Sequence, residues 1–445
     1  MYIDNRLINF CLKHKMFPEQ MKTTDGKNVV VSDPGLFNTK DGAQFFNAKV
    51  RIDSTLFIGN VMTFCEASSW SFREHDRKYD NVILVFCHDA NAKVLNSKGE
   101  EIPVVEVVIP ENVDRNSLTL LEAGGDTLCH QHIMEYSSQL MRHAWFAALG
   151  TEFLENELEH LQRYYKECGK DLNETFFYSI FRAFGFTTNR VETSMLARHI
   201  PLEAMNQCRD DLFQIEAIIL GQAGLLEIKP EVQCAIPDKY FDKAMNEGYF
   251  SKLRNEYLYL HHKYDMHHSC SKLIWNPFGK GGLSYPHVVL SMLANWWYCW
   301  KMTAESALNI ETVKEAMDLF NTHCTPYWET HNIFGAESKK CQKCLSDDKK
   351  AWLVVACLVP YLFFVGRLRS DEYLCDRAFD FMDQVKCFST PETKHFKEFG
   401  LEPRDAGEAL AMTYMKNKYC TAQCRLGDAR LCLKCRFGYE FIKKH

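Results

Sequence analysis

The sequence lacks an apolar run long enough for a typical membrane span. Its longest apolar stretch, AWLVVACLVPYLFFVG, extends from Ala351 to Gly366 and contains Pro360. A spanning helix needs about 20 apolar residues, and a proline inside a helix bends or breaks it. We therefore expect a buried, kinked core helix here and no contact with a membrane.

We also expect no export signal. The first residues, MYIDNRLINFCLKHKMF, contain no long apolar run and no small-residue cleavage site. This predicts a cytoplasmic protein whose 19 cysteines are reduced thiols rather than a disulfide framework. We expect most of these cysteines to be small core residues.

Excess charge and nucleotide-binding motifs are scarce. A net charge of -6 over 445 residues excludes a protein that attracts nucleic acid with its whole surface, and leaves a local basic patch open. The loop PFGKGGLSYP, residues 277–286, is glycine-rich but lacks the order of a P-loop. Neither a Rossmann fingerprint nor a G-x-S-x-G elbow is present.

What the chain does contain is an ordinary globular composition, with 46% hydrophobic and 25% charged residues. Strand-like runs, with a hairpin tip at Lys98 and Gly99, fill the first part, and helical periodicity follows. One helical face is predicted by the spacing of Leu154, Leu158, Leu161 and Tyr165. We expect three parts: an α/β domain over 1–115, a helical domain over 116–320, and a helical, cysteine-rich C-terminal region over 321–445.

The N-terminal part contains a predicted β-hairpin. Two strand-like runs, FFNAKVRI and TLFIGNVMTFC, are joined by a tight turn within residues 42–70. Alternation along the strands gives four inward positions, namely Gln44, Met62, Phe64 and Glu66. A mixed sheet that begins in this way suits the restriction-endonuclease-like core. In nucleases with that core, two carboxylates hold Mg²⁺ and a lysine helps to position the attacking water.

Several segments together resemble an uncharacterised family of the Bacteroidetes, known only as a domain of unknown function. They are NTKDGAQFFNAKVRI, GNVMTFCEASSW, HDRKYDNVIL, FRAFGFTTNR, FQIEAIILGQAGLLE, the Pro360 helix followed by a glycine, and the closing YC…CLKCRFG. The resemblance covers nearly the whole chain. It implies an N-terminal region similar to PD-(D/E)XK nucleases, and it carries no established activity.

The chain differs from this family at the positions where a metal site would need its ligands. The resemblance implies aspartate, glutamate, histidine and lysine where this chain has Gln44, Met62, Phe64 and Glu66. A divalent cation needs hard oxygen ligands, which methionine and phenylalanine do not offer. We therefore expect no intact catalytic site. The polar residues that remain either are remnants of a site or cap turns and tie the hairpin together; they are Asn38, Asn47, His75 and Asp80.

The tail YCTAQCRLGDARLCLKCRFGYEFIKKH carries a C-x3-C and a C-x2-C knuckle. Four thiolates from two knuckles would complete a tetrahedral zinc site, and an iron–sulfur cluster is the alternative. The four cysteines are Cys420, Cys424, Cys432 and Cys435. The resemblance supports three of them, because the family usually ends in three cysteines and the segment with Cys424 looks like an insertion.

Three further patterns stay open. A second C-x2-C, at Cys341 and Cys344, supplies ligands to the tail site, forms half of another site, or lies in an exposed loop with free thiols. Basic residues outnumber acidic ones in the tail, where aromatic residues alternate with them, so the tail either contacts nucleic acid or is a solvated face packed on the helical domain. The segment YLHHKYDMHHSC, residues 259–270, holds either a transition metal or solvated histidines.

Together these observations predict a non-catalytic binding or scaffold protein with a nuclease-like N-terminal sheet, whose unknown partner is nucleic acid or another protein. Two alternatives stay open. One is an active metal-dependent nuclease with an unorthodox residue set. The other is a zinc-stabilised assembly component without nucleic-acid contact.

Overall fold

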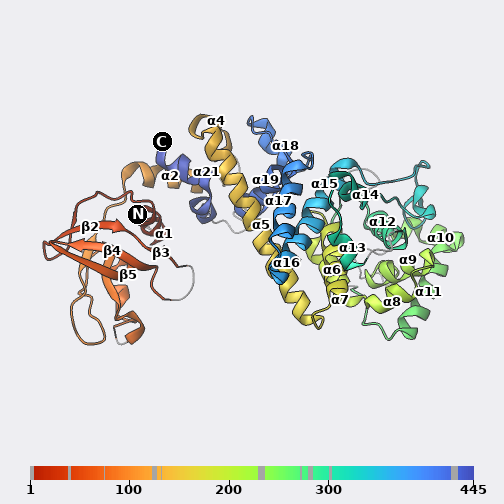
Figure 1. Ribbon diagram of the computed structural model, residues 1–445, viewed down its shortest axis with the longest axis horizontal. Helices are drawn as coiled ribbons and strands as arrows, with labels where there is room; N and C mark the ends of the chain where they lie inside the picture. Colours follow the sequence, from red (N-terminus) through yellow and green to blue (C-terminus); the bar gives the residue numbers. More distant parts are fainter. Residues whose placement is uncertain are drawn as a thin grey trace. The chain divides into compact units, whose positions relative to one another are not determined.

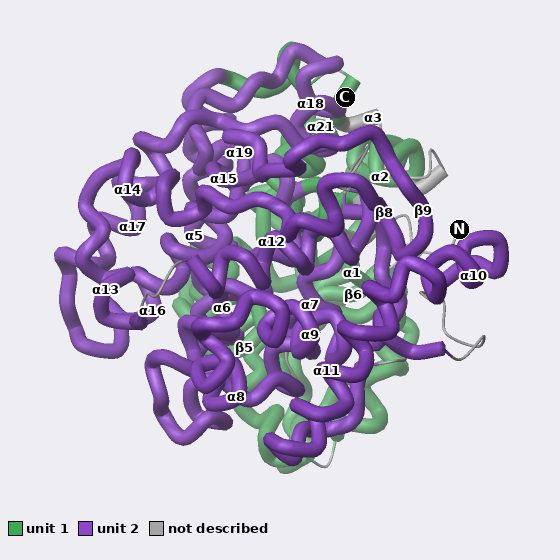
Figure 2. The backbone as a smooth tube through the Cα atoms, turned by 90° about the vertical axis from the view of Figure 1, so that its right-hand side faces the viewer, with its two compact units in different colours: residues 1–138, 416–445 green, residues 139–415 purple. Residues whose placement is uncertain are grey.

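The computed structural model of the chain describes residues 5–38, 42–74, 76–122, 128–131, 133–228, 236–270, 273–278, 284–299, 303–421 and 429–444. As predicted, the architecture is mixed α+β, with a mixed sheet near the N-terminus and a large helical region after it (Figure 1). Contacts divide the chain into two compact units, coloured in Figure 2. Unit 1 comprises residues 1–138 and 416–445, and unit 2 comprises residues 139–415. The three-part division stays a prediction, because contacts do not show which segments fold alone.

Unit 1 is built on a seven-stranded sheet with the order β1-β2-β4-β5-β6-β7, in which β3 also pairs with β4. Strands β2, β4 and β5 are antiparallel neighbours, whereas β5, β6 and β7 run parallel. The strands are β1 (Met21–Lys22), β2 (Asn28–Asp33), β3 (Leu36–Phe37), β4 (Phe45–Ile52), β5 (Thr55–Glu66), β6 (Val82–Asp89) and β7 (Val104–Glu106).

The predicted hairpin is confirmed as β4 and β5, joined by a two-residue turn at Asp53 and Ser54. Asp53 has a φ of 50° and its side chain accepts a hydrogen bond from the Asn28 backbone, which fixes the turn against β2. Helix α1 (Asn5–Lys13) packs against β5, where the Thr63 hydroxyl donates to Asn9 at 2.6 Å. The short 3-10 helices η1 (Ala67–Trp70) and η2 (Arg77–Tyr79) lead from β5 to β6.

The end of the chain returns to unit 1. The Asn116 side chain donates to the backbone oxygen of Ile442 at 3.0 Å, and the rings of His14 and Tyr439 stack 4.2 Å apart. The helical elements of unit 1 that follow the sheet or lie in the tail are α2 (Glu111–Glu122), α3 (Leu128–Gln131), α4 (Ile133–Tyr136), the π-helix η6 (Lys416–Thr421), the 3-10 helix η7 (Ala429–Lys434) and α21 (Arg436–Lys444).

Unit 2 is almost entirely helical, apart from the small hairpin β8 (His331–Ile333) and β9 (Ala336–Glu337). Its helices are α5 (Gln139–Glu167), α6 (Leu172–Phe184), α7 (Arg190–His199), α8 (Leu202–Gln207), α9 (Leu212–Gln222), α10 (Asp238–Glu247), α11 (Tyr249–Lys263), α12 (Pro286–Cys299), α13 (Ala304–Leu308), α14 (Val313–Asp318), η4 (Pro326–Glu329), α15 (Asp347–Leu353), the π-helix η5 (Val354–Leu358), α16 (Val359–Arg369), α17 (Glu372–Gln384), α18 (Pro391–Glu398) and α19 (Ala406–Met415).

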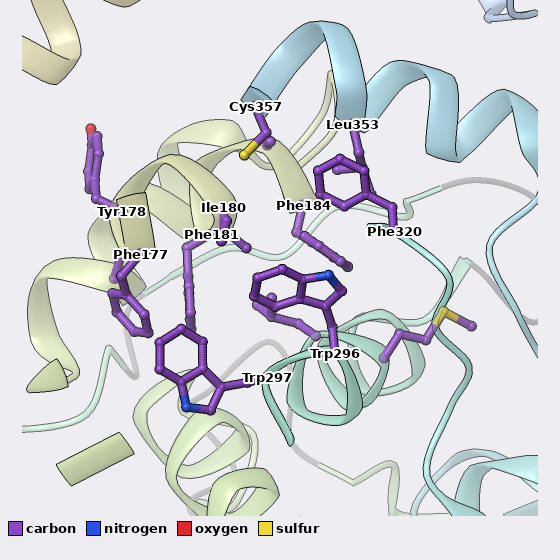
Figure 3. Close-up of a cluster of buried hydrophobic side chains, with 14 of the residues drawn as sticks. Phe177, Tyr178, Ile180, Phe181, Phe184, Trp296, Trp297, Phe320, Leu353 and Cys357 are labelled. Carbon is purple, nitrogen blue, oxygen red and sulfur yellow. The ribbon is translucent and has the colours of Figure 1, made fainter. Parts of the chain in front are cut away.

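Aromatic side chains of α6 and α12 fill the core of unit 2 (Figure 3). Phe177 meets Trp297 edge to face at 5.1 Å. The indole N–H of Trp296 donates to the backbone oxygen of Leu319 at 2.7 Å, so this fully buried ring leaves no polar atom unpaired. The predicted face of α5 is confirmed, because Leu154 and Leu161 are buried in the same core.

The long apolar stretch is a buried core helix, as predicted, and a π-turn interrupts it. Among the described residues, Asp347–Arg369 is the one helical stretch long and apolar enough to cross a membrane, and 83% of its most apolar window is buried. The π-turn of η5 precedes Pro360, and the backbone N–H of Val359 bonds to the oxygen of Val354. Proline lacks an N–H and its ring clashes with the carbonyl four residues earlier, so a widened turn accommodates it.

One predicted strand is wrong. The run AKVLN contributes only an isolated bridge between Leu95 and Glu101. The side chain of Asn96 accepts hydrogen bonds from the backbone of Lys98 and Glu100, and this closes a turn where the strand propensity of the run predicted a strand. The tip at Gly99 lies where it was predicted, with a φ of 78°.

Candidate functional site

The inward end of β5 is closed by apolar side chains. Met62 and Phe64 are buried in a cluster with Trp70, Tyr79 and apolar residues of β6. Phe64 meets Trp70 edge to face, with ring centroids 6.1 Å apart. Such side chains offer a divalent cation no oxygen ligand. The residues described at the inward end of β5 therefore form an apolar core.

Gln44 and Glu66 lie at the edges of this cluster. Oε1 of Gln44 accepts a hydrogen bond from the backbone of Thr63 at 3.3 Å. Glu66 is exposed at the carboxyl end of β5, where Oε2 accepts a long hydrogen bond from Asn91 at 3.4 Å. Asp89 is its register partner on the parallel strand β6. The carboxylates of Glu66 and Asp89 therefore lie at the ends of adjacent strands. The sequence alone does not show that they are neighbours, because their pairing depends on the strand register.

The other predicted polar residues hold turns and loops. The Asn38 side chain donates to the backbone oxygen of Ala43 at 3.0 Å. Asn47 is exposed and has a φ of 55° at an irregularity of the β4–β5 register. Oδ2 of Asp80 accepts a hydrogen bond from the Ser97 hydroxyl at 2.8 Å. Asn38 thus ties its loop to Ala43, whereas Asp80 ties the end of η2 to the turn at Ser97. His75 lies outside the described residues.

The tail brings three of its four predicted ligands into neighbouring elements. Cys420 lies on η6, Cys432 on η7, and Cys435 directly before α21, and all three are buried. η7 contacts both η6 and α21. Gly438 permits a close approach, because a Cβ there would lie 2.2 Å from the Cys432 carbonyl oxygen. Cys424 lies outside the described residues.

A histidine that sequence reasoning missed lies beside this knuckle. Nε2 of His130 is 3.6 Å from Sγ of Cys420, and His130 is only 2% exposed. His130 belongs to α3, which contacts α21. The two residues are 290 positions apart, so no spacing motif could have joined them. Thiolate and imidazole are ligands that Zn²⁺ prefers, and this pair supplies one of each. The described residues contain no group of three such ligand atoms within 4.8 Å of one another around this pair.

The aromatic residues of the tail pack inward. Phe437 and Phe441 are buried, and Tyr439 stacks on His14. The buried rings of Phe437 and Phe441 cannot stack on a base, which needs an exposed ring face, and contact of the tail with nucleic acid stays a prediction. Burial, together with nearby Lys13, Arg436 and Lys443, lowers the pKa of His14 to about 4.

The comparisons with known proteins give one result. A family model described as "Protein of unknown function (DUF2851)" matches residues 5–389. The chain belongs to this family. No curated protein and no solved structure matches the chain. The DUF2851 match includes the whole N-terminal sheet and ends before the cysteine-rich tail, so the tail must be interpreted from its own residues.

Within the part of the chain that the structure describes, two other cysteine and histidine patterns of this DUF2851 chain show no converging ligands. Cys341 and Cys344 are exposed free thiols between β9 and α15. In the histidine-rich segment, Nε2 of His261 lies 3.1 Å from the backbone oxygen of His267, to which it donates. That nitrogen is therefore occupied by a proton rather than offered to a metal. Cys270 is buried.

A further group in unit 2 could bind a cation. Ligand atoms of Glu247, His331 and Glu337 lie within 4.8 Å of one another. Nδ1 of His331 lies 3.1 Å from the Tyr327 backbone oxygen, which leaves Nε2 to face Glu247 at 3.4 Å. However, Glu337 already pairs with Lys243 at 3.0 Å. A metal bound to all three residues would have to displace this lysine.

One cavity of about 220 Å³ lies between α5, α17 and α19. Nδ1 of His143 lies 2.7 Å from Oε1 of Glu408, which also accepts a hydrogen bond from Arg404 at 2.8 Å. Burial opposes the charge of Glu408, but the hydrogen bonds from Arg404 and His143 outweigh it and lower its pKa. The cavity is therefore lined by a carboxylate that already has two partners.

Proposed function

We propose that this protein is a non-catalytic binding protein of the cytoplasm. Its N-terminal sheet is nuclease-like, has no metal chemistry, and docks an acidic segment of a partner protein on its outer face. The order of α1, the hairpin β4–β5, two short helices and the parallel strand β6 supports the nuclease-like ancestry.

The loss of catalysis rests on the core of β5. Met62 is fully buried and Phe64 is 6% exposed, both inside a cluster closed by Trp70. Restoring a carboxylate at either place would bury a charge among apolar groups, which costs free energy unless the charge is paired. The apolar residues of this cluster stabilise one another, so the sheet keeps its fold without a metal.

The docking face is a stripe of exposed side chains on β3, β4 and β5, which we call the outer stripe. The register sets its members opposite one another in pairs. The pairs are Leu36 with Phe46, Lys49 with Ile58, and Arg51 with Leu56. The aliphatic members are 72%, 62% and 50% exposed, for Leu36, Ile58 and Leu56 respectively.

The chemistry of the outer stripe specifies its partner. Exposed apolar groups gathered on one face mark an interaction site. Lys49 and Arg51 lie among these groups, and no ion pair to either is present within the described part of the chain. A protein segment with apolar side chains flanked by carboxylates complements both features. Three aliphatic side chains and a single phenylalanine favour such a segment over nucleic acid, whose bases stack on aromatic rings.

The tail supplies a structural metal centre in this proposal. Zinc is the metal that thiolate knuckles bind in structural sites, and an iron–sulfur cluster is the alternative. The buried Cys420, Cys432 and Cys435 support the centre, with Cys424 as the fourth ligand predicted from spacing. The centre would hold the C-terminal helix on unit 1 and would have no catalytic role.

The docking experiment uses a fluorescent peptide of alternating glutamate and leucine and measures its dissociation constant by anisotropy. The double variant Lys49→Glu/Arg51→Glu is expected to bind at least about tenfold more weakly, because two attractive charges become repulsive. Lys98→Glu, an exposed lysine at the tip of a separate turn, is the control and should bind as the wild type does. Equal binding by all three proteins would refute the docking site. Binding of single-stranded DNA instead of the peptide would favour nucleic acid as the partner.

The second candidate function is an active nuclease, favoured by the adjacent carboxylates of Glu66 and Asp89. Its test is cleavage of DNA and RNA in Mg²⁺ and in Mn²⁺ by the wild type and by Glu66→Ala. Our proposal predicts identical traces for the two proteins. Metal-dependent cleavage that Glu66→Ala abolishes would establish the enzyme and overturn the proposal.

A further inference from the structure

We propose that Glu247, His331 and Glu337 form a zinc site on the surface of unit 2. One imidazole nitrogen and two carboxylate oxygens would hold the ion, and its fourth position would be left to water, as in zinc sites with three protein ligands. This inference goes beyond the proposed function, because neither the outer stripe nor the tail cysteines take part in it. All the residues that carry it belong to one compact unit.

The three side chains converge from three elements. Glu247 is the last residue of α10, His331 is the first residue of β8, and Glu337 is the last residue of β9. One ligand atom from each lies within 4.8 Å of the other two. The turn of the hairpin lies against α10, since a Cβ at Gly335 would be 2.5 Å from the backbone oxygen of Tyr240. The fold thus brings the hairpin to the end of the helix.

His331 directs a lone pair toward the site. Its Nδ1 lies 3.1 Å from the backbone oxygen of Tyr327, and a carbonyl oxygen only accepts, so Nδ1 carries the proton. His331 is 8% exposed, and its ring stacks on the ring of Tyr327 with centroids 4.1 Å apart. Nε2 is therefore the nitrogen that faces Glu247. Histidines that bind metals are usually oriented in this way, by a hydrogen bond from the other nitrogen.

Tyr327 also positions the first carboxylate. Its hydroxyl donates to Oε2 of Glu247 at 2.7 Å and accepts a hydrogen bond from the Gly335 backbone at 3.2 Å. Oε1 of Glu247 is the oxygen that faces His331. A single tyrosine thus orients two ligands, one through its backbone oxygen and one through its hydroxyl. Outer-shell partners of this kind hold ligands in place for a metal.

The distance between the facing atoms fits a shared zinc ion. Nε2 of His331 and Oε1 of Glu247 are 3.4 Å apart. A charge-assisted hydrogen bond from nitrogen to a carboxylate is shorter, at about 2.7–2.9 Å. Zinc–nitrogen bonds of about 2.0–2.1 Å and zinc–oxygen bonds of about 2.0–2.2 Å, set at a tetrahedral angle, separate the two ligand atoms by about 3.4 Å. The spacing therefore fits a bridging ion better than a direct hydrogen bond.

The third ligand has a competing partner in Lys243. Nζ of this lysine lies 3.0 Å from Oε1 of Glu337, and the two side chains are 46% and 64% exposed. An exposed ion pair of this kind contributes little to stability. A divalent ion held at the same time by His331 and Glu247 therefore has a weak competitor to displace. Removal of the lysine charge should strengthen zinc binding.

The experiment begins with the wild-type, full-length protein in solutions of zinc sulfate. Elemental analysis after dialysis counts the bound zinc, and X-ray absorption at the zinc edge identifies its neighbours. We expect one zinc per chain with nitrogen and oxygen neighbours, in addition to any zinc bound to sulfur in the tail. Zinc bound to sulfur alone would overturn this site and leave the tail centre standing. Zinc with nitrogen and oxygen neighbours alone would support this site and leave the tail without zinc. Absence of zinc would overturn both.

Variants of the ligands then test the residues themselves. His331→Ala should lower zinc affinity by more than about 100-fold, because loss of an outer-shell partner already costs about 10–100-fold. Tyr327→Phe keeps the ring but removes the hydroxyl, so it should lower the affinity by about 10–100-fold. Glu337→Gln should also lower the affinity. The Glu337 side chain is exposed, so this variant keeps the test decisive if His331→Ala fails to fold.

Lys243→Met tests the competitor and should raise the affinity for zinc. Two matched controls should bind zinc as the wild type does. One is Lys239→Met, which changes another exposed lysine of α10, and the other is His262→Ala, which changes an exposed histidine of α11. Unchanged affinity in both Glu337→Gln and Lys243→Met would refute the proposal. A loss of zinc in His262→Ala as large as in His331→Ala would refute it as well.

Discussion

The substitution Glu157→Gln should destabilise unit 2 strongly, because Glu157 is the common partner of two buried arginines. Its carboxylate accepts hydrogen bonds from Nε and a terminal nitrogen of Arg182 at 2.8 and 3.0 Å, and from Arg190 at 2.8 Å. These three side chains are 7%, 11% and 15% exposed. The cluster joins α5, α6 and α7.

The magnitude follows from what glutamine leaves behind. The amide fills the same volume, but it removes the one negative charge that offsets two buried guanidinium groups. Breaking a buried ion pair by removing one partner costs about 3–5 kcal/mol. Burial alone would raise the pKa of Glu157, but the charges of Arg190 and Arg182 outweigh it and lower the pKa. The contribution is therefore present above the ordinary value of 4.5 and is lost as the pH falls below it.

The assay is urea unfolding at pH 7, followed by circular dichroism. Glu305→Gln is the control, because Glu305 pairs with Arg369 at the surface, where the side chains are 62% and 41% exposed and such a pair contributes about 0–1 kcal/mol. Adding Arg190→Met to Glu157→Gln should recover part of the loss, since it removes one uncompensated charge. A loss below about 1 kcal/mol in Glu157→Gln would refute the reasoning.

Two further predictions concern α9. Burial raises the pKa of Glu216 to about 7, although hydrogen bonds such as the one from Trp328 oppose this rise. The folded protein therefore favours the protonated form of Glu216. The stability that this group contributes to the wild type is present below pH 4.5 and is lost as the pH rises through 7. Glu216→Gln should therefore gain about 3 kcal/mol relative to the wild type between pH 4.5 and pH 8 in urea unfolding, and a pH-independent difference would contradict this. Gly221→Ala should lower the free energy of unfolding by about 1–3 kcal/mol, because a Cβ would lie 2.2 Å from the ring of Tyr257. An unchanged unfolding midpoint would show that α9 and α11 can move apart at little cost in stability.

Local patterns predicted the elements whose formation depends on nearby residues. The spacing of Leu154 and Leu161 predicted the buried face of α5, and the turn residues after β4 predicted the hairpin. The apolar run around Pro360 predicted a bent core helix, but not the π-turn, because the choice between two kinds of turn depends on how neighbouring helices pack. Strand propensity misled at AKVLN, where a side chain closed a turn.

For the candidate sites too, the sequence pointed to features that are local in the chain and not to those that depend on folding. The thiol spacing singled out Cys420, Cys432 and Cys435, which the fold places buried on neighbouring elements; that they bind a metal stays a prediction. His130 and the pairing of Glu66 with Asp89 depend on tertiary contacts and on strand register, which a single sequence does not encode as spacing. The sequence thus singles out residues that are neighbours in the chain and misses pairs that folding brings together.

Binding of Mn²⁺ at the sheet, followed through methyl NMR signals of the methionines, is the most direct test of a nuclease-like sheet without metal chemistry. Met62 lies in the cluster at the inward end of β5, and Met205, buried in unit 2, is the internal reference. Paramagnetic Mn²⁺ broadens the signals of nuclei close to its binding site. We expect the Met62 and Met205 signals to respond equally to Mn²⁺. Selective broadening of Met62 that Glu66→Ala removes would contradict the account and place a metal site on this sheet.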